Sequence, residues 1–229
     1  MKKIMSLLIM TILLGHSSAF AKIDDIEKHK TYWYEDSGIW EKYQYNSDDI
    51  LMQRDLRKCA DGGNYMCSSS IGNILFDKEK YAQAYPFLLA ASKKYDGVHD
   101  EILGQMYGKG TGVLLNYDKA IYHFKKAAKD GSFSAAYNLS WIYEMKSRSC
   151  GAYNSKDYAA RRYNRVRAHA WARVASALGQ KECHYTNGDS ADLSTHINED
   201  RELLGRLGWL SEANQISAEI CSSVKGCNQ

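Results

Sequence analysis

Apolar side chains recur along most of the chain three or four residues apart, and few stretches alternate between apolar and polar residues. Proline, which interrupts helices, occurs once, at Pro86. The pattern therefore predicts an almost entirely helical protein after the N-terminal segment. Pro86 falls inside one expected helix. A proline there destabilises the helix by about 3 kcal/mol unless the helix bends or begins late, so the pattern does not fix where this helix begins.

Alanines recur in pairs seven residues apart at three places, Ala84–Ala91, Ala120–Ala127 and Ala168–Ala175. Since this spacing is about two helical turns, both alanines of a pair lie on one face of a helix. Small residues on that face allow a second helix to approach closely. Gly131 and Gly179 each follow the first alanine of a pair by eleven residues, where glycine can end the helix in a left-handed conformation.

The same spacing predicts a repeating unit of two helices joined by a turn, about 36 residues long. The second unit shows its turn as Gly110-Thr111-Gly112-Val113, and the third carries about a dozen extra polar residues between its helices. We place this insertion at 147–164. Neighbouring units of this kind stack and bury one continuous core, because no single unit can bury its apolar face alone.

The second unit carries a set of residues spread over almost thirty positions: Leu103-Gly104, Tyr107, Gly110, Gly112-Val113, Asp118, Ala120, Ala127-Ala128 and Gly131. On these residues it closely resembles the Sel-one-like repeat (SLR), a relative of the tetratricopeptide repeat. The third unit matches more loosely, since Ser140 stands where the family has glycine, and the first unit lacks the glycine pair of the turn.

The resemblance implies an all-α fold, a right-handed α-solenoid of helix-turn-helix repeats with helical caps at both ends. Three repeats are expected within 59–183, over about 64–98, 99–132 and 133–182. The caps would be 22–58, where Tyr and Trp crowd a charged segment that could alternatively be a binding arm, and 184–229. Proteins of this family act as scaffolds, adaptors and inhibitors, so the resemblance implies that the partner is another protein.

The first 21 residues have the pattern of a cleaved secretory signal peptide. Lys2 and Lys3 precede an apolar run over 5–14, which is too short to span a bilayer, where about 20 residues are needed. Removal of 1–21 leaves 28 basic residues against 27 acidic ones, a balance that argues against a nucleic-acid partner. The short, lysine-led signal is typical of bacteria, so we expect a periplasmic protein with no stable membrane insertion.

All six cysteines follow the signal peptide, and an even number in a secreted chain predicts disulfides, with reduced thiols as the alternative. The pair Cys59–Cys67 resembles the cysteine-rich branch of the SLR family, in which a disulfide joins the end of one helix to the start of the next. The pair Cys221–Cys227 is similarly close in sequence and is expected to bond near the C-terminus. The remaining pair, Cys150–Cys183, would tie the insertion to the end of the third repeat.

The first helix of each repeat is expected to line the concave face of the solenoid. The positions that point away from the core predict a partner-binding set of Asn73, Glu101, Gln105, Tyr137 and Trp141. Tyr137 and Trp141 place aromatic rings where solvated residues are expected, and such rings are favoured at interface hot spots. The alternative is that both rings pack beneath the insertion.

A basic run enters the second helix of the third repeat. Arg161, Arg162 and Arg165 form a candidate electrostatic patch that would meet an acidic surface of the partner. The alternative is a solvated helix face.

Patterns for catalysis or metal binding are weak in this sequence. Ser222-x-x-Lys225 has the spacing of a serine β-lactamase nucleophile motif, but the partner motifs Lys-Thr-Gly and Ser-Asp-Asn do not occur. No two histidines have the spacing of metal ligands, and the glycines over 108–112 mark a turn between helices rather than a phosphate loop. We therefore expect no metal, no cofactor and no enzymatic activity.

The sequence favours a periplasmic immunity or inhibitor protein that neutralises an antibacterial effector of the phospholipase type. Secreted SLR proteins resemble the immunity partners of such effectors from type VI secretion, and a rigid, disulfide-linked surface suits the blocking of an enzyme. The alternative is a periplasmic scaffold or adaptor in envelope assembly, and a remote alternative is a β-lactam-binding protein or cell-wall hydrolase. We expect a monomer or a weak dimer.

Overall fold

The computed structural model describes residues 49–94, 97–149, 155–180, 182–184 and 190–227. The chain divides into two compact units, Met1–Met52 and Gln53–Gln229. Of the first unit only the beginning of one helix is described, so the described fold is that of the second unit. The predicted signal peptide, 1–21, and most of the predicted N-terminal cap, 22–58, lie outside the described residues.

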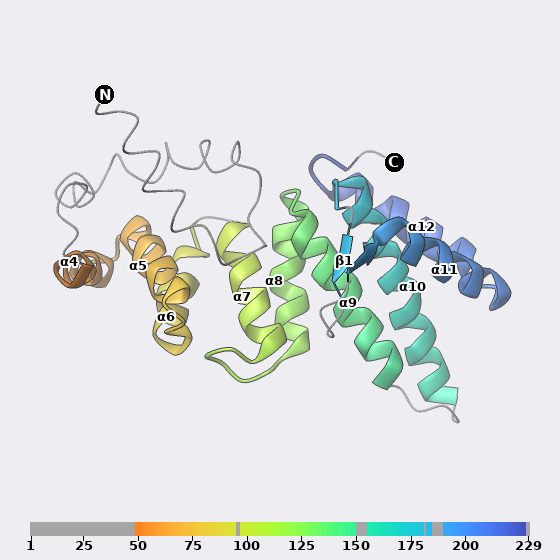
Figure 1. The fold of residues 1–229 in the computed structure, drawn as a ribbon, viewed down its shortest axis with the longest axis horizontal. Coiled ribbons are helices and arrows are strands. Elements are labelled where there is room, and N and C mark those ends of the chain that lie inside the picture. Colours follow the sequence, from red (N-terminus) through yellow and green to blue (C-terminus); the bar gives the residue numbers. More distant parts are fainter. Residues whose placement is uncertain (1–48, 95–96, 150–154, 181, 185–189, 228–229) are drawn as a thin grey trace. The chain divides into compact units, whose positions relative to one another are not determined.

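Helices make up nearly all of the described part of the second unit, and they follow one another in pairs (Figure 1). Helix α4 (Asp49–Asp61) precedes the pairs, which are α5 (Tyr65–Asp77) with α6 (Tyr81–Ala91), α7 (Val98–Lys109) with α8 (Tyr117–Lys129), α9 (Phe133–Ser149) with α10 (Ser155–Ala177), and α11 (Leu193–Arg206) with α12 (Leu210–Ser223). Neighbouring pairs share a core, because α6 packs on α7, α8 on α9, and α10 on both α11 and α12. This arrangement is an α-solenoid and confirms the predicted fold class.

Short-range contacts set the ends of several helices. Asn64 and Asn116 precede α5 and α8, and each side-chain oxygen accepts a hydrogen bond of 2.9 Å from a backbone amide of the first turn, that of Met66 and that of Lys119. Gly110 follows α7 in the left-handed conformation, with φ 69°, which stops the helix without steric cost.

Gly112 lies in the turn between α7 and α8, where the turn meets the start of α6. Its φ is 72°, and a Cβ atom there would come within 2.5 Å of the carbonyl carbon of Tyr81 and 2.6 Å of the amide nitrogen of Ala82. Only glycine tolerates both the backbone conformation and this approach. The glycine-containing turn of the second pair therefore holds that pair against the first.

The alanines spaced seven residues apart lie in the core, as the sequence predicts. No more than 4% of the surface is exposed on any of Ala84, Ala91, Ala120, Ala127, Ala168 and Ala175. Gly131 and Gly179, eleven residues after two of these alanines, have φ of 96° and 107°. Both follow the end of a helix, α8 and α10 respectively, and let the chain turn toward the next element.

Close contact within a pair depends on a small residue in its first helix. A Cβ atom on Gly72 would come within 2.9 Å of the Leu88 side chain, and one on Gly104 within 2.7 Å of the Phe124 ring. Ser140 takes the corresponding place in the third pair, where it is buried and donates a hydrogen bond of 2.8 Å to a backbone carbonyl of its own helix. The third pair thus accommodates a hydroxyl where the first two pairs exclude even a methyl group.

The predicted insertion at 147–164 is largely helical. Residues 147–149 continue α9 and 155–164 form the first part of α10, whereas 150–154 lie outside the described residues. This corrects the expectation of a polar segment between the two helices, because the extra residues lengthen both. The sequence also did not predict a small antiparallel sheet, in which β1 (Glu182–His184) pairs with β2 (Ser190–Asp192) just before α11.

Two disulfides fasten the helices near both ends of the described chain. Cys59–Cys67 joins the end of α4 to the start of α5, and Cys221–Cys227 joins the end of α12 to the residues beyond it. These are two of the three expected bonds; for the third, Cys150 and the side chain of Cys183 lie outside the described residues. None of the described helices has both the length and the apolar composition needed to cross a membrane.

Candidate functional site

The residues predicted to bind a partner lie on the first helices of three pairs, and each is half-buried. Asn73 is on α5, Glu101 and Gln105 are on α7, and Tyr137 and Trp141 are on α9. Each side chain is partly accessible and partly packed within the solenoid, and Oδ1 of Asn73 is among the buried atoms. A partner on these helices would therefore contact only part of each of the five side chains.

Glu101 belongs to a contact between two helix pairs. Its carboxylate accepts a hydrogen bond of 2.7 Å from the hydroxyl of Ser132, and that hydroxyl accepts one of 3.0 Å from the amide of Ala135. Since Ser132 directly precedes α9, these bonds fasten α7 to the start of α9. Glu101 thus has a structural role, and its contact with a partner stays a prediction.

Tyr137 and Trp141 pack against the largest core cluster, to which α8, α9 and α10 contribute. Part of each ring is buried in this way and part is accessible. The side chains of 149–157 lie outside the described residues, so the alternative of packing beneath the insertion concerns atoms that the structure does not describe. The role of the two rings as binding anchors stays a prediction.

The predicted electrostatic patch on α10 needs correction, because its arginines interact within the chain. Arg162 lies 2.7 Å from the carboxylate of Glu212 on α12. Arg161 is half-buried and also interacts within the chain. The side chain of Arg165 is only 19% exposed. Arg162 and Arg165 thus join α10 to other helices instead of offering unpaired charges to a partner.

Arg165 is the centre of a charged cluster that joins α9, α10 and α11. Its guanidinium contacts the carboxylate of Asp200 and, at 3.3 Å, that of Glu144. Arg148 contacts Glu144 at 2.7 Å, and Nε2 of His196 lies 3.6 Å from Glu144 and 3.8 Å from Asp200. Burial raises the pKa of Asp200, with Arg165 and His196 opposing the shift. The opposite charges balance one another at the point where the three helices meet.

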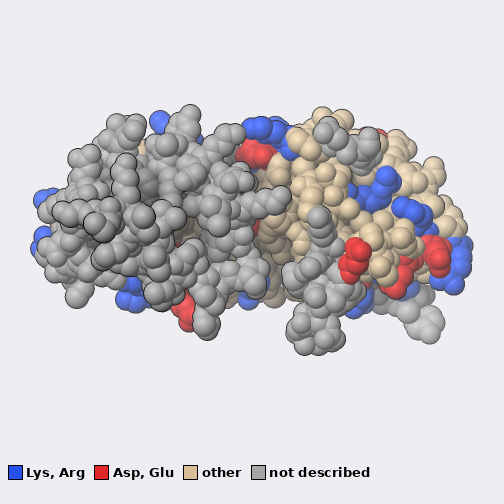
Figure 2. Space-filling model, turned by 45° about the horizontal axis from the view of Figure 1, so that its top comes forward, with Lys and Arg blue, Asp and Glu red and all other residues tan. Residues whose placement is uncertain are grey.

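The same cluster lines a pocket of about 320 Å³, whose wall is completed by Glu199, Leu203 and Arg206. The pocket is polar, and both acidic and basic side chains line it. At the right of Figure 2, where Figure 1 places α11 and α12, Lys or Arg and Asp or Glu side chains also lie side by side. We regard this pocket as a junction between helices, because its central charges are engaged with one another.

A second ionic network, between α7 and α8, was not predicted from the sequence. Asp100 is fully buried; its carboxylate accepts a hydrogen bond of 2.7 Å from Nδ1 of His123 and forms an ion pair with Nζ of Lys126 at 2.9 Å. The His123 ring stacks on Tyr107 with 5.6 Å between centroids, and the hydroxyls of Tyr107 and Tyr85 lie 2.6 Å apart. Burial acts to raise the pKa of Asp100, but the bonds from His123 and Lys126 outweigh it and lower that pKa.

The sequence contained a signal for this network. Asp100 precedes Leu103 by three residues and Tyr107 by seven, so its side chain shares their core-facing side of the helix. His123 lies between Ala120 and Ala127 in the same way. A charged residue at a core position is rarely buried without a partner, so these two residues pointed to a buried pair. The network fastens the two helices of the second pair.

Comparison with known proteins places the fold. No family model matches the chain, and no curated protein matches it. Among solved structures, the chain is similar to a protective antigen present in uropathogenic Escherichia coli strains that displays an SLR fold, with a TM-score of 0.51 at 17% identity. The alignment covers 87% of this chain and 39% of that one, so the chain spans well under half the length of that protein.

The fold is the SLR fold. This finding confirms the resemblance noted in the sequence at the level of the fold. Within the SLR fold of this chain, Ser222 of the β-lactamase-like spacing donates a hydrogen bond of 2.7 Å to the carbonyl of Glu219 in its own helix. Among the described residues, no group of three His, Cys, Asp or Glu side chains is placed to hold a metal ion.

Proposed function

We propose that the chain is a protein-binding repeat protein of the periplasm. The observation that carries the proposal is the stack of helix pairs with an SLR fold, in which both buried ionic networks join helices to one another. A solenoid of this kind leaves long helix faces on its outside, and such faces suit another macromolecule. The two disulfides support an oxidising compartment.

The proposal keeps the predicted organisation of the chain. A signal peptide over 1–21 would direct it across the inner membrane, and the repeats within 59–183 would lie between caps at 22–58 and 184–229. Gln105, Tyr137 and Trp141 are the contacts that we propose on the first helices, because each of these side chains is partly accessible, whereas the carboxylate of Glu101 is held by Ser132.

We further propose that the partner is an antibacterial effector of the phospholipase type and that the chain acts as its immunity protein. A rigid partner can block an enzyme at little entropic cost, and helix pairs with shared cores and disulfides at both ends of the described chain supply that rigidity. An effector that acts on the membrane from the periplasm would meet the protein in the compartment that the disulfides support.

The test is protection from a secreted lipase-like toxin encoded beside this chain. The toxin, directed to the periplasm, should stop growth, and co-expression of the full chain should restore it. A form without residues 1–21 should give no protection, because it would stay in the cytoplasm. A toxin variant without its nucleophile checks that growth arrest reflects lipase activity.

The outcomes separate the proposed classes of function. A periplasmic scaffold would give no rescue and would not co-purify with the toxin, and that result would contradict the immunity proposal. A Tyr137→Ala/Trp141→Ala variant should co-purify less toxin than the parent protein while keeping the same helical content by circular dichroism. Equal co-purification would exclude these two rings as contacts without excluding rescue.

A further inference from the structure

The exposed face of α8 carries an unusual set of side chains. Lys119, Tyr122, Lys125 and Lys129 are all exposed and lie on one side of the helix, because their spacing follows its turns; we call them the basic face of α8. Tyr122 is 61% exposed, although large rings are usually at least half buried. Lys126, which lies beside them, is half-buried and bonds Asp100, so it is not counted in this face.

The acids near this face do not neutralise it. Asp118, at the start of α8, is bonded at 2.8 Å to Lys146 of α9. Asp130 follows the helix and lies close to Gly97, with no ion pair to Lys125 or Lys129 among the described residues. The exposed side of α11 differs, because there Glu199 and Glu202 alternate with Arg201 and Arg206.

The stability of α8 does not explain these lysines. Lys125 and Lys129 are four residues apart, where like charges repel and weaken a helix slightly. Lys119 lies in the first turn, where the helix dipole disfavours a cation, although its Nζ lies 5.0 Å from the centre of the Tyr107 ring. The dipole favours a cation only at the other end of the helix, at Lys129.

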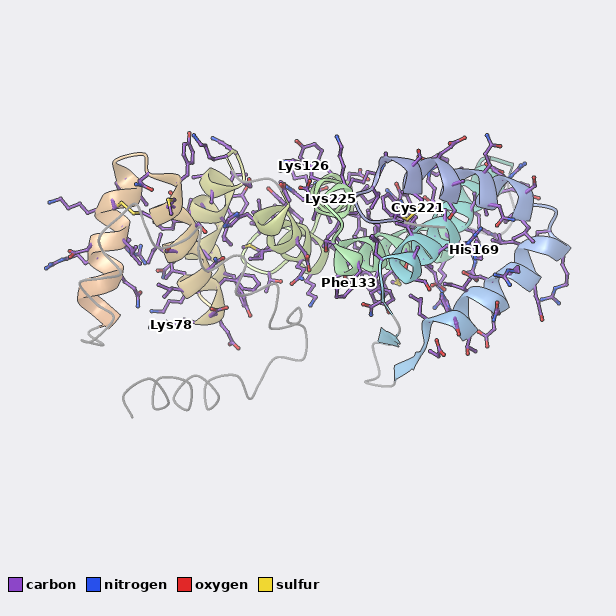
Figure 3. All side chains as sticks on the ribbon, turned by 90° about the horizontal axis from the view of Figure 1, so that it is seen from above. Lys78, Lys126, Phe133, His169, Cys221 and Lys225 are labelled. Atoms are coloured by element: carbon purple, nitrogen blue, oxygen red, sulfur yellow. A yellow bond between two sulfur atoms is a disulfide. The ribbon has the colours of Figure 1, made fainter. Side chains whose placement is uncertain are left out.

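Another lysine extends the face beyond the helix. The amide of Lys225 donates a hydrogen bond of 3.0 Å to the carbonyl of Lys129, so the exposed Lys225 lies beside the end of α8. Figure 3 shows Lys225 next to Lys126 at this end of the helix. Cations from two distant parts of the sequence therefore meet around one exposed tyrosine-bearing helix face.

We infer that the basic face of α8, extended by Lys225, docks an acidic surface of the protein partner, with Tyr122 as an apolar contact at its centre. This inference rests on the proposed protein-binding function. Charge complementarity steers association and fixes the orientation of a partner, and Tyr is among the residues enriched at hot spots. A face of separate lysines on one helix fits acidic side chains of a folded surface.

The test measures binding of the mature full chain to a fluorescent polyglutamate peptide by anisotropy. The affinity should fall steadily as salt rises from about 50 to about 200 mM, since screening weakens exposed charge contacts. Lys125→Gln/Lys129→Gln should weaken binding about tenfold, equivalent to about 1.4 kcal/mol. The matched control is Lys80→Gln/Lys93→Gln, which removes the same charge from exposed positions around α6.

Each other outcome would overturn the inference. An equal loss in the control variant would mean that net charge alone governs binding. Equal binding of phosphatidylglycerol vesicles or duplex DNA, with the same dependence on Lys125 and Lys129, would identify a membrane or a nucleic acid as the partner surface. Absence of polyglutamate binding at low salt would refute the acidic surface while leaving toxin rescue, and thus the proposed function, open to its own test.

Discussion

The backbone amide of Lys225 donates a hydrogen bond to the carbonyl of Lys129, 3.0 Å away. The loop that contains Lys225 is closed by Cys221–Cys227 at the end of α12, whereas Lys129 is the last residue of α8. Val224 and Cys221 also lie in the core cluster that includes residues of α8 and α9. Helix α12 itself packs on α10. Through the bond between Lys225 and Lys129, the loop also connects the last helix pair to the second pair.

Replacement of both cysteines should release this loop. Cys221→Ser/Cys227→Ser removes a closed loop of about seven residues, which the chain-entropy description values at about 2 kcal/mol. We expect urea unfolding to show a loss of that size, and hydrogen exchange at the Lys225 amide to become fast. Cys59→Ser/Cys67→Ser is the control, because it should lower stability without changing exchange at Lys225. Slow exchange at Lys225 in the first variant would show that the loop stays docked without its disulfide.

The same contact makes replacement of Gly131 costly. Its φ is 96°, and a Cβ atom would lie 2.7 Å from the carbonyl oxygen of Lys225. Gly179 has a similar φ, 107°, but a Cβ there would meet nothing within 4 Å. Gly179→Ala should therefore cost only the backbone strain, about 1 kcal/mol, while Gly131→Ala should cost about 1–2 kcal/mol more. Equal losses in thermal or urea unfolding would show that the Lys225 carbonyl can move away.

Much of the fold could be predicted from the sequence, because small residues at fixed spacing report helix contacts directly. The alanines seven residues apart are buried, and Gly131 and Gly179 end their helices as expected. Pro86 could not be placed by the same argument. It is the sixth residue of α6, so it leaves only the carbonyl of Ala82 without its helical donor, and since both residues are exposed, water can serve that carbonyl.

Ion pairs between residues far apart in the sequence could not be predicted. Arg165 finds Asp200 thirty-five residues away and Glu144 twenty-one residues away, and no local pattern encodes such partners. The three arginines therefore resembled a free patch although two have acidic partners on other helices. The predicted insertion at 147–164 was assigned to a polar segment between helices for a related reason. A helix that carries many Arg, Tyr and Asn residues has the same polarity as a loop, and polarity alone does not distinguish the two.

Truncation of Arg165 should be far more costly than truncation of its neighbour Arg162. Arg165→Ala leaves Asp200, which is 3% exposed, and Glu144 without their central cation, and removal of one partner from such a buried group costs about 3 kcal/mol. Arg162→Ala breaks an exposed pair with Glu212 and should cost less than about 1 kcal/mol. Urea unfolding of both variants measures the difference, and similar losses would mean that the Asp200 carboxyl becomes neutral without strain.

His169 should make the protein sensitive to mild acid. His169, labelled in Figure 3, lies on α10. Its side chain is fully buried, and neither ring nitrogen has a hydrogen-bond partner among the described residues. Burial, followed by the charge of Arg173, lowers the pKa of His169 from 6.5 to about 4. Arg165 on the same helix and the basic residues Arg201 and His196 on α11 act in the same direction.

The direction in which stability changes with pH follows from proton uptake by the unfolded chain. Between about pH 6.5 and about pH 4 the unfolded chain protonates His169 while the folded chain does not, so the contribution of neutral His169 to stability is present above pH 6.5 and is lost as the pH falls. The loss should approach about 3 kcal/mol at pH 4. His169→Leu should unfold with a weaker pH dependence, so its stability relative to the parent should rise as the pH falls through this window. Since Asp200 and the other carboxyls titrate in both proteins, parallel curves of unfolding free energy against pH would assign the acid sensitivity to groups other than His169.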